Sequence, residues 1–457
     1  MKLHNTLSNK LEEFLPIDSK NIRMYVCGPT VYDRPHIGNA RSVVVYDMLY
    51  RILREIYGSD NVTYVRNITD VDDKINARAL ELGVTIQDLT SSIYKEFHAD
   101  MAYLGCLDPT HEPKATQHIS DIIKLIELLI LNKHAYVTNG HVYFDVTSAR
   151  DYGVLSGRTL DEMIAGSRIE VNENKNHPGD FVLWKPVSNK DDISSIFDSP
   201  WGKGRPGWHI ECSSMSNHFF GTDFDIHGGG ADLIFPHHTN EIAQSCSAFP
   251  GSKFAHYWVH NGFLTVGGAK MSKSLGNFLT MQYFLDKNIQ GEVIRYWLFS
   301  THYRKPIDFN EKALYDSTAS MNYLYRSIEN IDIIKTDIPD IFLDYLNDDL
   351  NTAGALSFMH LLAKNIYKST KVEDKITYAS QLKACGILLG ILMNDPQEWF
   401  VGNSDIDAVF VNNLVEKRRI AKIERDWLRA DEIRNRLRSM DVEVEDHPDG
   451  SSSWRKM

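Results

Sequence analysis

The sequence predicts an α/β protein: a parallel-sheet domain, interrupted by an inserted subdomain, is followed by an α-helical region. Apolar strands alternate with amphipathic helices in the first hundred residues. A less regular stretch rich in Gly, Asn and Lys interrupts this alternation at roughly 115–200, and helical patterning dominates after Lys312. At 457 residues, 43% of them apolar and 24% charged, the chain has room for several folded domains and is neither disordered nor fibrous.

The first hundred residues predict the order strand–helix–strand–helix. The first helix has apolar side chains at helical spacing, at Val45, Leu49, Ile52 and Ile56. Two strands joined by a crossover helix are expected to lie parallel, as in nucleotide-binding sheets. The expected elements are strand 23–27, a turn at Gly28-Pro29, helix 37–57, strand 62–68 and helix 70–82.

The later segments predict an insertion, a return to the sheet and then a helical bundle. Sheet character returns at 223–226, which leads into His227 and three glycines. The charged helix near the end of the chain is expected to precede a short polar tail. The expected elements are helix 118–132, strand 142–146, strand 223–226, helix 237–248, extended segments within 257–266, a bundle from Lys312 and a charged helix over 405–440.

Charge and cysteine content restrict the function. With 49 basic and 61 acidic residues the net charge is −12, so we expect no DNA partner and no general nucleic-acid coat. One local exception is residues 417–438, where nine Lys/Arg face four Asp/Glu. Five widely spaced cysteines argue against a disulfide framework and predict a cytoplasmic protein. No apolar run is long enough for a membrane helix or a secretory signal.

The first motif is Pro35-His36-Ile37-Gly38-Asn39, which follows the first strand and turn and begins the first helix. His36 and Asn39 lie on one face of the first helical turn, where unpaired N–H groups and the helix dipole favour phosphates. Gly38 leaves space for a flat base against the backbone. The alternative interpretation is a helix cap with a surface histidine.

The second motif is Lys270-Met271-Ser272-Lys273-Ser274, in a loop flanked by glycines. Two lysines on a flexible loop can follow a moving, highly charged group such as a leaving pyrophosphate. The alternative is a solvated loop, which is the commoner fate of such a pentapeptide.

A third group of residues predicts a metal site. His237 and Glu241 are four residues apart on one helical face and can offer a nitrogen and an oxygen ligand. Cys27 and Cys212 lie far away in sequence, and spacing alone leaves open that they are small core residues.

The two motifs, in this order and on these elements, resemble the signatures of class I aminoacyl-tRNA synthetases. Asn39 stands where many members carry His, although Asn can still donate hydrogen bonds. Further segments resemble the cysteinyl-tRNA synthetase family: Gly28–Asp33 (GPTVYD), Asn67–Lys74 (NITDVDDK), Asp180–Lys185 (DFVLWK), Gly207–Cys212 (GWHIEC) and Phe235–His238 (FPHH).

This resemblance implies a Rossmann-like catalytic domain that activates L-cysteine with ATP and transfers it to tRNA(Cys). It implies one Zn²⁺ per chain, held by Cys27, Cys212, His237 and Glu241, and Mg²⁺ bound with ATP. The implied catalytic residues are His36, Asn39, Lys270 and Lys273. The implied ATP-binding residues are His36, Gly38, Gly228, Gly229 and Lys273, and those for cysteine are Thr69, Trp208, His227 and Asp232. For Trp208 plain packing is the alternative, and His238 is expected to be structural.

The resemblance also divides the chain and suggests a tRNA platform at its end. Arginine and lysine near the end of the chain are expected to contact RNA phosphates, and tryptophan is expected to stack on bases. The alternative is a charged helix face that only contacts solvent. The expected RNA contacts are Arg418, Arg419, Lys422, Trp427 and Trp454. The expected divisions are 1–114 and 205–260 (catalytic domain), 115–204 (insertion), 261–311 (second motif and stem contact), 312–400 (tRNA-binding bundle) and 401–457 (anticodon-binding region).

Two other functions compete with this interpretation. One is a related ligase that joins cysteine to an amino sugar, and the other is a non-catalytic RNA-binding paralogue. The long helical half with its basic segment favours tRNA over an amino sugar, and the intact motifs favour catalysis. A monomer is expected.

Overall fold

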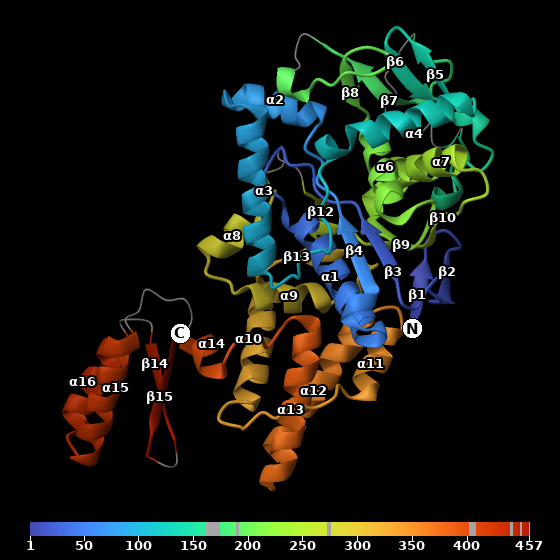
Figure 1. The fold of residues 1–457 in the computed structure, drawn as a ribbon. Coiled ribbons are helices and arrows are strands. Elements are labelled where there is room, and N and C mark those ends of the chain that lie inside the picture. Colours follow the sequence, from blue (N-terminus) through green and yellow to red (C-terminus); the bar gives the residue numbers. More distant parts are fainter. Residues whose placement is uncertain are drawn as a thin grey trace. The chain divides into compact units, whose positions relative to one another are not determined.

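The computed structural model describes residues 1–160, 162, 174–188, 192–271, 276–401, 408–438, 442–447 and 450–456 (Figure 1). The chain forms two units. The first comprises Met1–Ala313 and Asp340–Leu356, and the second comprises Leu314–Pro339 and Ser357–Met457.

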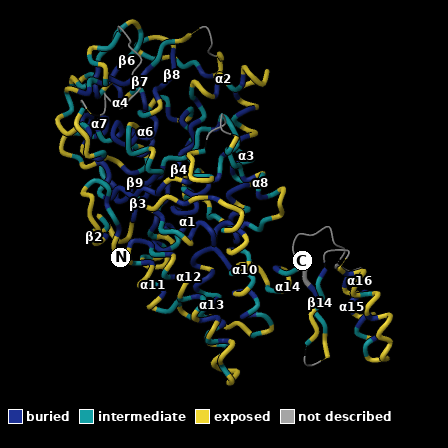
Figure 2. The backbone as a smooth tube through the Cα atoms, turned by 180° about the vertical axis from the view of Figure 1, so that it is seen from behind, coloured by how far each residue is buried: buried dark blue, intermediate teal, exposed yellow. Residues whose placement is uncertain are grey.

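The centre of the first unit is a four-stranded parallel sheet, β10-β9-β3-β4 (Figure 1). Its strands are β3 (Ile22–Val26), β4 (Val62–Arg66), β9 (Asp223–Gly230) and β10 (Phe254–Asn261). Because β9 pairs with β3, residues about two hundred positions apart in sequence lie side by side. The strands are mostly buried, as is usual when helices cover both faces of a parallel sheet (Figure 2).

Helices cover both faces of this sheet. Side chains alternate between faces along a strand. In β9 His227 contacts Glu241 of α7 (Thr239–Ala248), whereas Gly228 lies against Tyr46 of α1 (Ile37–Tyr57). The first helix and α7 therefore pack on opposite faces. The helices of this part are α1 (Ile37–Tyr57), α2 (Asp73–Leu82), α3 (Ile86–Tyr103), α6 (Trp208–Phe220) and α7 (Thr239–Ala248).

The insertion is an antiparallel sheet, β5-β6-β7-β8, with helix α4 (Ile119–Leu131). Its apolar core includes Ile126 and Trp184 and continues into Ile210 of α6 and Ala243 of α7. The insertion is therefore packed onto the helices that follow it in sequence. Its strands are β5 (Ala135–Thr138), β6 (His141–Phe144), β7 (Phe181–Pro186) and β8 (Gly204–Pro206).

Shorter elements complete the first unit. An N-terminal hairpin lies beside β10, and a small three-stranded sheet, β12-β11-β13, follows the central sheet. These elements are β1 (Lys2–Asn5), β2 (Lys10–Glu13), β11 (Leu264–Val266), β12 (Ala269–Lys270), α8 (Met281–Asp286), α9 (Gly291–Phe299), β13 (Ile307–Phe309) and α11 (Asp340–Asn347).

The remaining elements are helical except for a C-terminal hairpin. They are α10 (Glu311–Ser327), α12 (Thr352–Lys368), α13 (Val372–Leu389), α14 (Pro396–Val401), α15 (Ala408–Ile423), α16 (Trp427–Arg438), β14 (Val442–Asp446) and β15 (Ser452–Lys456). No helix in the described parts of the chain is long and apolar enough to cross a membrane.

The α/β interpretation is confirmed, and the helix expected over 37–57 has those bounds. Most other boundaries differ by a few residues, and strand 23–27 is β3 at Ile22–Val26. Strand β4 ends at Arg66, and α2 begins at Asp73 because the Asp72 side chain accepts from the N–H of Lys74 and caps the helix. The three glycines do not follow the strand: β9 runs through Gly230 because its backbone pairs with β10 to the end.

Two larger features were not expected. Helix α3 is absent from the sequence analysis, although Leu89, Ile93 and Phe97 have helical spacing. The charged segment is two helices, with Arg425 at φ 61° between them, and its polar tail is the hairpin β14–β15. A residue with positive φ cannot continue a right-handed helix.

Candidate active site and metal centre

The candidate site lies at the carboxyl ends of the central strands, where open α/β sheets bind ligands. Cys27 comes directly after β3, and Thr69 follows β4 by three residues. Helix α1, which begins with the first motif, is the connection between these two strands. The topology therefore brings the residues predicted to bind zinc and cysteine, and the motif predicted to bind ATP, to one edge of the sheet.

His36 is the N-cap of α1, which confirms the capping interpretation of the first motif. Its Nδ1 accepts from the N–H of Asn39 at 3.2 Å, and the Asn39 side-chain oxygen accepts from the N–H of His36 at 3.2 Å. Burial lowers the pKa of the His36 imidazole, against a smaller opposing effect of the Asp232 carboxylate. The ring is therefore neutral at pH 7, and because Nδ1 accepts, the proton is on Nε2.

The cap thus leaves two donors for a ligand. Nε2–H of His36 can donate, and so can the amide nitrogen of Asn39, since its oxygen is fixed by the cap. The capping and ligand-binding interpretations of this motif are compatible.

The second motif is described only in part. Lys270 ends β12, with its Nζ 4.4 Å from the centre of the Phe263 ring. Lys273 and Ser274 lie outside the described residues. The segment after the motif returns to the first one: the N–H of Ile37 donates to the carbonyl of Leu279 at 2.8 Å. The two motifs are therefore neighbours.

Gly38 lies where the two motifs meet. A Cβ on Gly38 would lie 2.9 Å from the His36 ring and 3.1 Å from Cε of Met271. A larger residue would push against both motifs at once, which gives a packing reason for glycine at this position.

Arg41 holds α1 to the base of the hairpin that carries the second motif. Its guanidinium is fully buried and donates to the carbonyls of Gly262, Phe263, Tyr303 and Lys305, at 2.7 to 3.2 Å. Burial lowers its pKa to about 10, so it stays charged at neutral pH. Four carbonyls from two segments are thus held by one side chain.

We expect Arg41→Met to destabilise the protein by about 2–4 kcal/mol, because charge-assisted hydrogen bonds are lost and buried carbonyls are left unpaired. The measurement is denaturant unfolding of the purified chain. Arg78→Met is the control, since Arg78 pairs with Glu81 at the surface and its loss should matter little. Equal stability of the two variants would contradict this role for Arg41.

The four predicted metal ligands form a cluster in the structure. One ligand atom from each of Cys27, Cys212, His237 and Glu241 lies within 4.8 Å of the others. The two sulfurs are 3.6 Å apart, Sγ of Cys27 is 3.4 Å from Oε1 of Glu241, and Nε2 of His237 is 3.0 Å from the same oxygen. Ligands at ~2.0–2.3 Å from a tetrahedral zinc are roughly 3.3–3.8 Å apart, so the cluster fits such an ion.

Each ligand is fixed by a different element. Cys27 follows β3, Cys212 lies on α6 and Glu241 is in the first turn of α7. His237 precedes that helix in the kinked segment Ile234–His238, where Phe235 is extended. Burial lowers the pKa of His237 well below its usual value, so the ring is neutral and able to ligate. Burial raises the pKa of the Cys27 thiol, so thiolates here need a cation.

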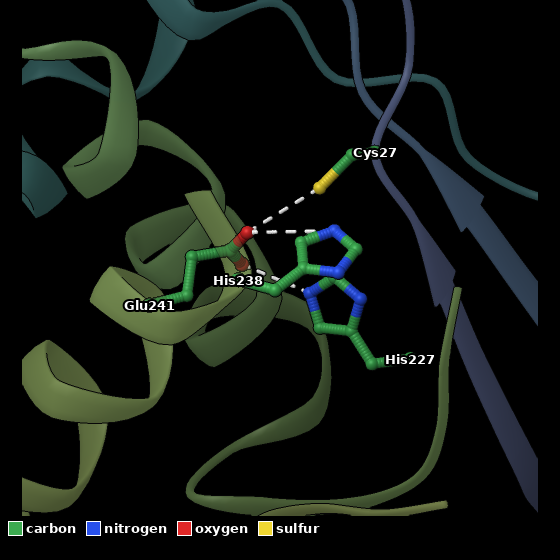
Figure 3. A group of neighbouring side chains, drawn as sticks. All are labelled: Cys27, His227, His238 and Glu241. Atoms are coloured by element: carbon green, nitrogen blue, oxygen red, sulfur yellow. Dashed lines mark hydrogen bonds and ion pairs between the residues drawn. The ribbon is translucent and has the colours of Figure 1, made fainter. Parts of the chain in front are cut away.

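A second set of possible ligands shares Cys27 and Glu241 but adds His227 and His238 (Figure 3). His227 Nε2 lies 2.9 Å from Oε2 of Glu241, and His238 Nε2 lies 3.9 Å from Oε1. The set with two sulfurs suits zinc better, because thiolates are its preferred ligands. His238 then lies outside the ligand set, with its Nδ1 2.8 Å from Nε2 of His260, and its structural role stays a prediction.

The burial of His227 argues against its expected contact with cysteine. Its ring is 0% exposed, lies flat against Trp258 and bonds the outer oxygen of Glu241. In this position His227 can orient that carboxylate, and its contact with cysteine stays a prediction.

The other residues expected around cysteine are placed differently from one another. Trp208 is 38% exposed and stacks on His237 at 4.2 Å, so it is not merely core packing. Thr69 is buried and donates to Glu211 Oε2 at 3.0 Å. Asp232 is exposed and close enough to affect His36 electrostatically.

Gly228 and Gly229 have a packing explanation that does not involve ATP. A Cβ on Gly228 would lie 2.3 Å from the Tyr46 ring, and one on Gly229 would lie 2.8 Å from the His238 ring. The Tyr46 hydroxyl also bonds the backbone of Gly229. Protein side chains therefore fill the space that a Cβ would take at both glycines, and their expected contact with ATP stays a prediction.

Sequence reasoning missed two residues next to the cluster. His209 Nδ1 lies 2.9 Å from Nδ1 of His237, and Glu211, which pairs with Thr69, is fully buried. Burial raises the pKa of Glu211 well above its usual value. Both occur in the GWHIEC segment quoted above, so their neighbour Cys212 was the available signal.

The predicted RNA contacts differ in accessibility. Trp454 is 8% exposed and its Nε1 donates to Asn412, and Arg418 is 7% exposed and paired with Asp446. Their burial argues against RNA contact for both. Trp427, at 61% exposure, and the more exposed Lys422 and Arg419 stay candidates.

Asp446 is expected to couple the C-terminal hairpin to α15 in a pH-dependent way. The hydrogen bond from Arg418, and further ones from Lys422 and Ser452, hold its pKa below the usual 3.8. A carboxyl with a lowered pKa stabilises above its unfolded pKa and loses this as pH falls through the folded pKa. We expect amide exchange in 442–456 to be about two- to fivefold faster in Asp446→Asn at pH 7, and the variant and parent to converge at low pH. An unchanged exchange rate at pH 7 would contradict the coupling.

Comparison with known proteins agrees with this geometry. Residues 13–319 match the family described as tRNA synthetases class I (C) catalytic domain, and residues 341–393 match the DALR domain. The fold resembles Mycobacterium tuberculosis methionyl-tRNA synthetase (TM-score 0.56, 15% identity, 81% of this chain and 89% of that one). It also resembles a putative arginyl-tRNA synthetase from Campylobacter jejuni (TM-score 0.56, 14% identity, 82% and 95%).

The protein is thus a class I aminoacyl-tRNA synthetase. It is 55% identical over 454 residues to the cysteine–tRNA ligase of Rickettsia felis, and 56% identical over 454 residues to that of Rickettsia africae. Each alignment covers 99% of this chain and 98% of the relative. The chain belongs to the cysteine–tRNA ligase family.

Proposed function

We propose that this chain activates L-cysteine with ATP and transfers it to tRNA(Cys), selecting cysteine at a zinc ion. The observation that carries the proposal is the buried cluster of two sulfurs, one nitrogen and one oxygen, placed at the sheet edge beside the first motif. Cys27, Cys212, His237 and Glu241 would hold the ion.

Zinc supplies a Lewis-acidic centre that binds a substrate thiolate and discriminates against a hydroxyl. A pocket without metal would separate cysteine from serine or alanine by only about 1–3 kcal/mol. Trp208, stacked on His237 and partly exposed, is placed to cover a bound amino acid.

In the activation step the cysteine carboxylate attacks the α-phosphorus of ATP, and pyrophosphate leaves. No protein nucleophile is needed, so positioning and charge stabilisation do the work. Nε2–H of His36 and the amide of Asn39 would donate to phosphate oxygens at the N-terminus of α1. Lys270 and Lys273, with Mg²⁺, would offset the charge of the leaving pyrophosphate.

In the transfer step a terminal ribose hydroxyl of the tRNA attacks the adenylate carbonyl and AMP leaves. Arg419, Lys422 and Trp427 are the accessible candidates for contact with the rest of the tRNA. A monomer and a cytoplasmic location stay predictions.

The experiment is attachment of labelled cysteine to bulk tRNA in the presence of ATP and Mg²⁺, with serine and alanine as competitors. We expect cysteine-specific charging. Cysteine-dependent pyrophosphate release without charging of tRNA would favour the amino-sugar ligase. Absence of both pyrophosphate release and charging would favour the non-catalytic paralogue.

A further inference from the structure

A cluster of metal-ligating side chains lies apart from the catalytic centre. His118, Asp121 and His218 bring one ligand atom each to within 4.8 Å of the others. Nδ1 of His118 is 3.2 Å from Oδ2 of Asp121, and Nδ1 of His218 is 3.0 Å from the same oxygen. The two imidazole rings meet edge to face at 4.6 Å.

Two packed helices position this cluster. His118 comes directly before α4 and Asp121 is in its first turn, so the two share a helix face. His218 is in the last turn of α6, against which α4 packs. The ring of Phe219 lies beside both histidine rings, with its centre 5.9 Å from the ring centre of His118 and 5.0 Å from that of His218. His118 is 8% exposed, so its orientation is fixed by packing.

We propose that His118, Asp121 and His218 form a second metal site, for a divalent transition-metal cation such as Zn²⁺, Co²⁺ or Ni²⁺. Imidazole nitrogens and a carboxylate are the ligands these ions take in proteins. Ligands at ~2.0–2.2 Å from one ion are roughly 3.3 Å apart, close to the two nitrogen–oxygen distances here. With only three protein ligands and a half-exposed His218, water completes the coordination.

The site would join the insertion to the helix that carries Cys212. Lys124 is the one described cation beside Asp121, with Nζ 3.6 Å from Oδ1. Because its side chain is 74% exposed and it uses the other oxygen, it can move away when an ion binds at Oδ2. The competing explanation is that both histidines only donate hydrogen bonds from Nδ1 to this oxygen.

The test counts Co²⁺ bound per chain after metal has been stripped, and records the absorption of each equivalent. Ions bound by thiolates absorb strongly through sulfur-to-cobalt charge transfer, whereas a site with two nitrogens and one oxygen shows only weak bands. We expect the parent to bind one equivalent without the thiolate band. His218→Asn and Asp121→Asn should each lose that equivalent.

His256→Asn is the matched control. His256 also faces a carboxylate, with its Nε2 3.7 Å from Oδ1 of Asp223, but among the described residues it belongs to no cluster of three possible ligands. It should keep the equivalent. The far-ultraviolet circular dichroism of each variant reports whether it is folded, and the partly exposed His218 can be replaced without opening the core. The proposal is overturned if all Co²⁺ bound by the parent shows the thiolate band. It is also overturned if both folded variants keep the equivalent of Co²⁺ that lacks this band.

Discussion

Cys212→Ser is expected to lose bound zinc and the preference for cysteine together. A serine hydroxyl is not deprotonated near neutral pH and cannot replace a buried thiolate as a ligand. Substituting a residue that only hydrogen-bonds to a metal ligand typically lowers metal affinity by about 10–100-fold. Loss of a ligand itself should therefore lower it by more than about 100-fold. Elemental analysis of zinc per chain, and kcat/KM for cysteine-dependent pyrophosphate exchange, measure the two effects.

Cys246→Ser is the matched control for this change. Cys246 is a partly buried thiol of the same unit, but its Sγ lies 3.5 Å from the carbonyl of Ser252 and it is not in the cluster. This variant should keep both zinc and activity. Full zinc content in Cys212→Ser would remove Cys212 from the ligand set and favour the set with His227 and His238.

Local patterns predicted those parts of the fold that are determined locally. Helix α1 has both its apolar spacing and its cap within one segment, so its bounds follow from the sequence. Strand β9 does not: Gly228, Gly229 and Gly230 have no strand preference of their own, and they are extended because β9 pairs with its neighbours. Tertiary pairing here outweighs local propensity.

The candidate site shows the same division. His237 and Glu241 are four residues apart on adjoining helical turns, and that pair was visible in the sequence. Cys27 joins them only because β9 lies beside β3 and α6 packs on the same face, which no local spacing reveals. The ligands Cys27 and Cys212 were predicted from the family resemblance.

Charge patterns were the least informative. A mixed-charge helix looks the same whether its basic residues face solvent or pair within the protein. Arg418 is held by Asp446, on a hairpin that the sequence analysis interpreted as a tail. The burial of Trp454 likewise depends on that hairpin packing against α15.

Two substitutions of His36 are expected to separate its role as a helix cap from its role as a hydrogen-bond donor in catalysis. In His36→Asn, Oδ1 can accept from the N–H of Asn39 as Nδ1 does, but no donor reaches the position of Nε2. We expect stability close to the parent and adenylate formation lowered by about 10²–10³-fold, the usual cost of one preorganised donor. Single-turnover adenylation and thermal unfolding measure the two effects.

His36→Gln reverses this arrangement. Its Nε2 can donate from nearly the same place as the imidazole Nε2, whereas glutamine is too long to cap as asparagine does. We expect it to be less stable than His36→Asn, by about 0.5–2 kcal/mol, yet faster in adenylation. Because a purely structural His36 would make rate follow stability, the opposite order of the two variants is the signature of a catalytic donor. If the rate instead falls with stability in both, His36 acts only as a cap.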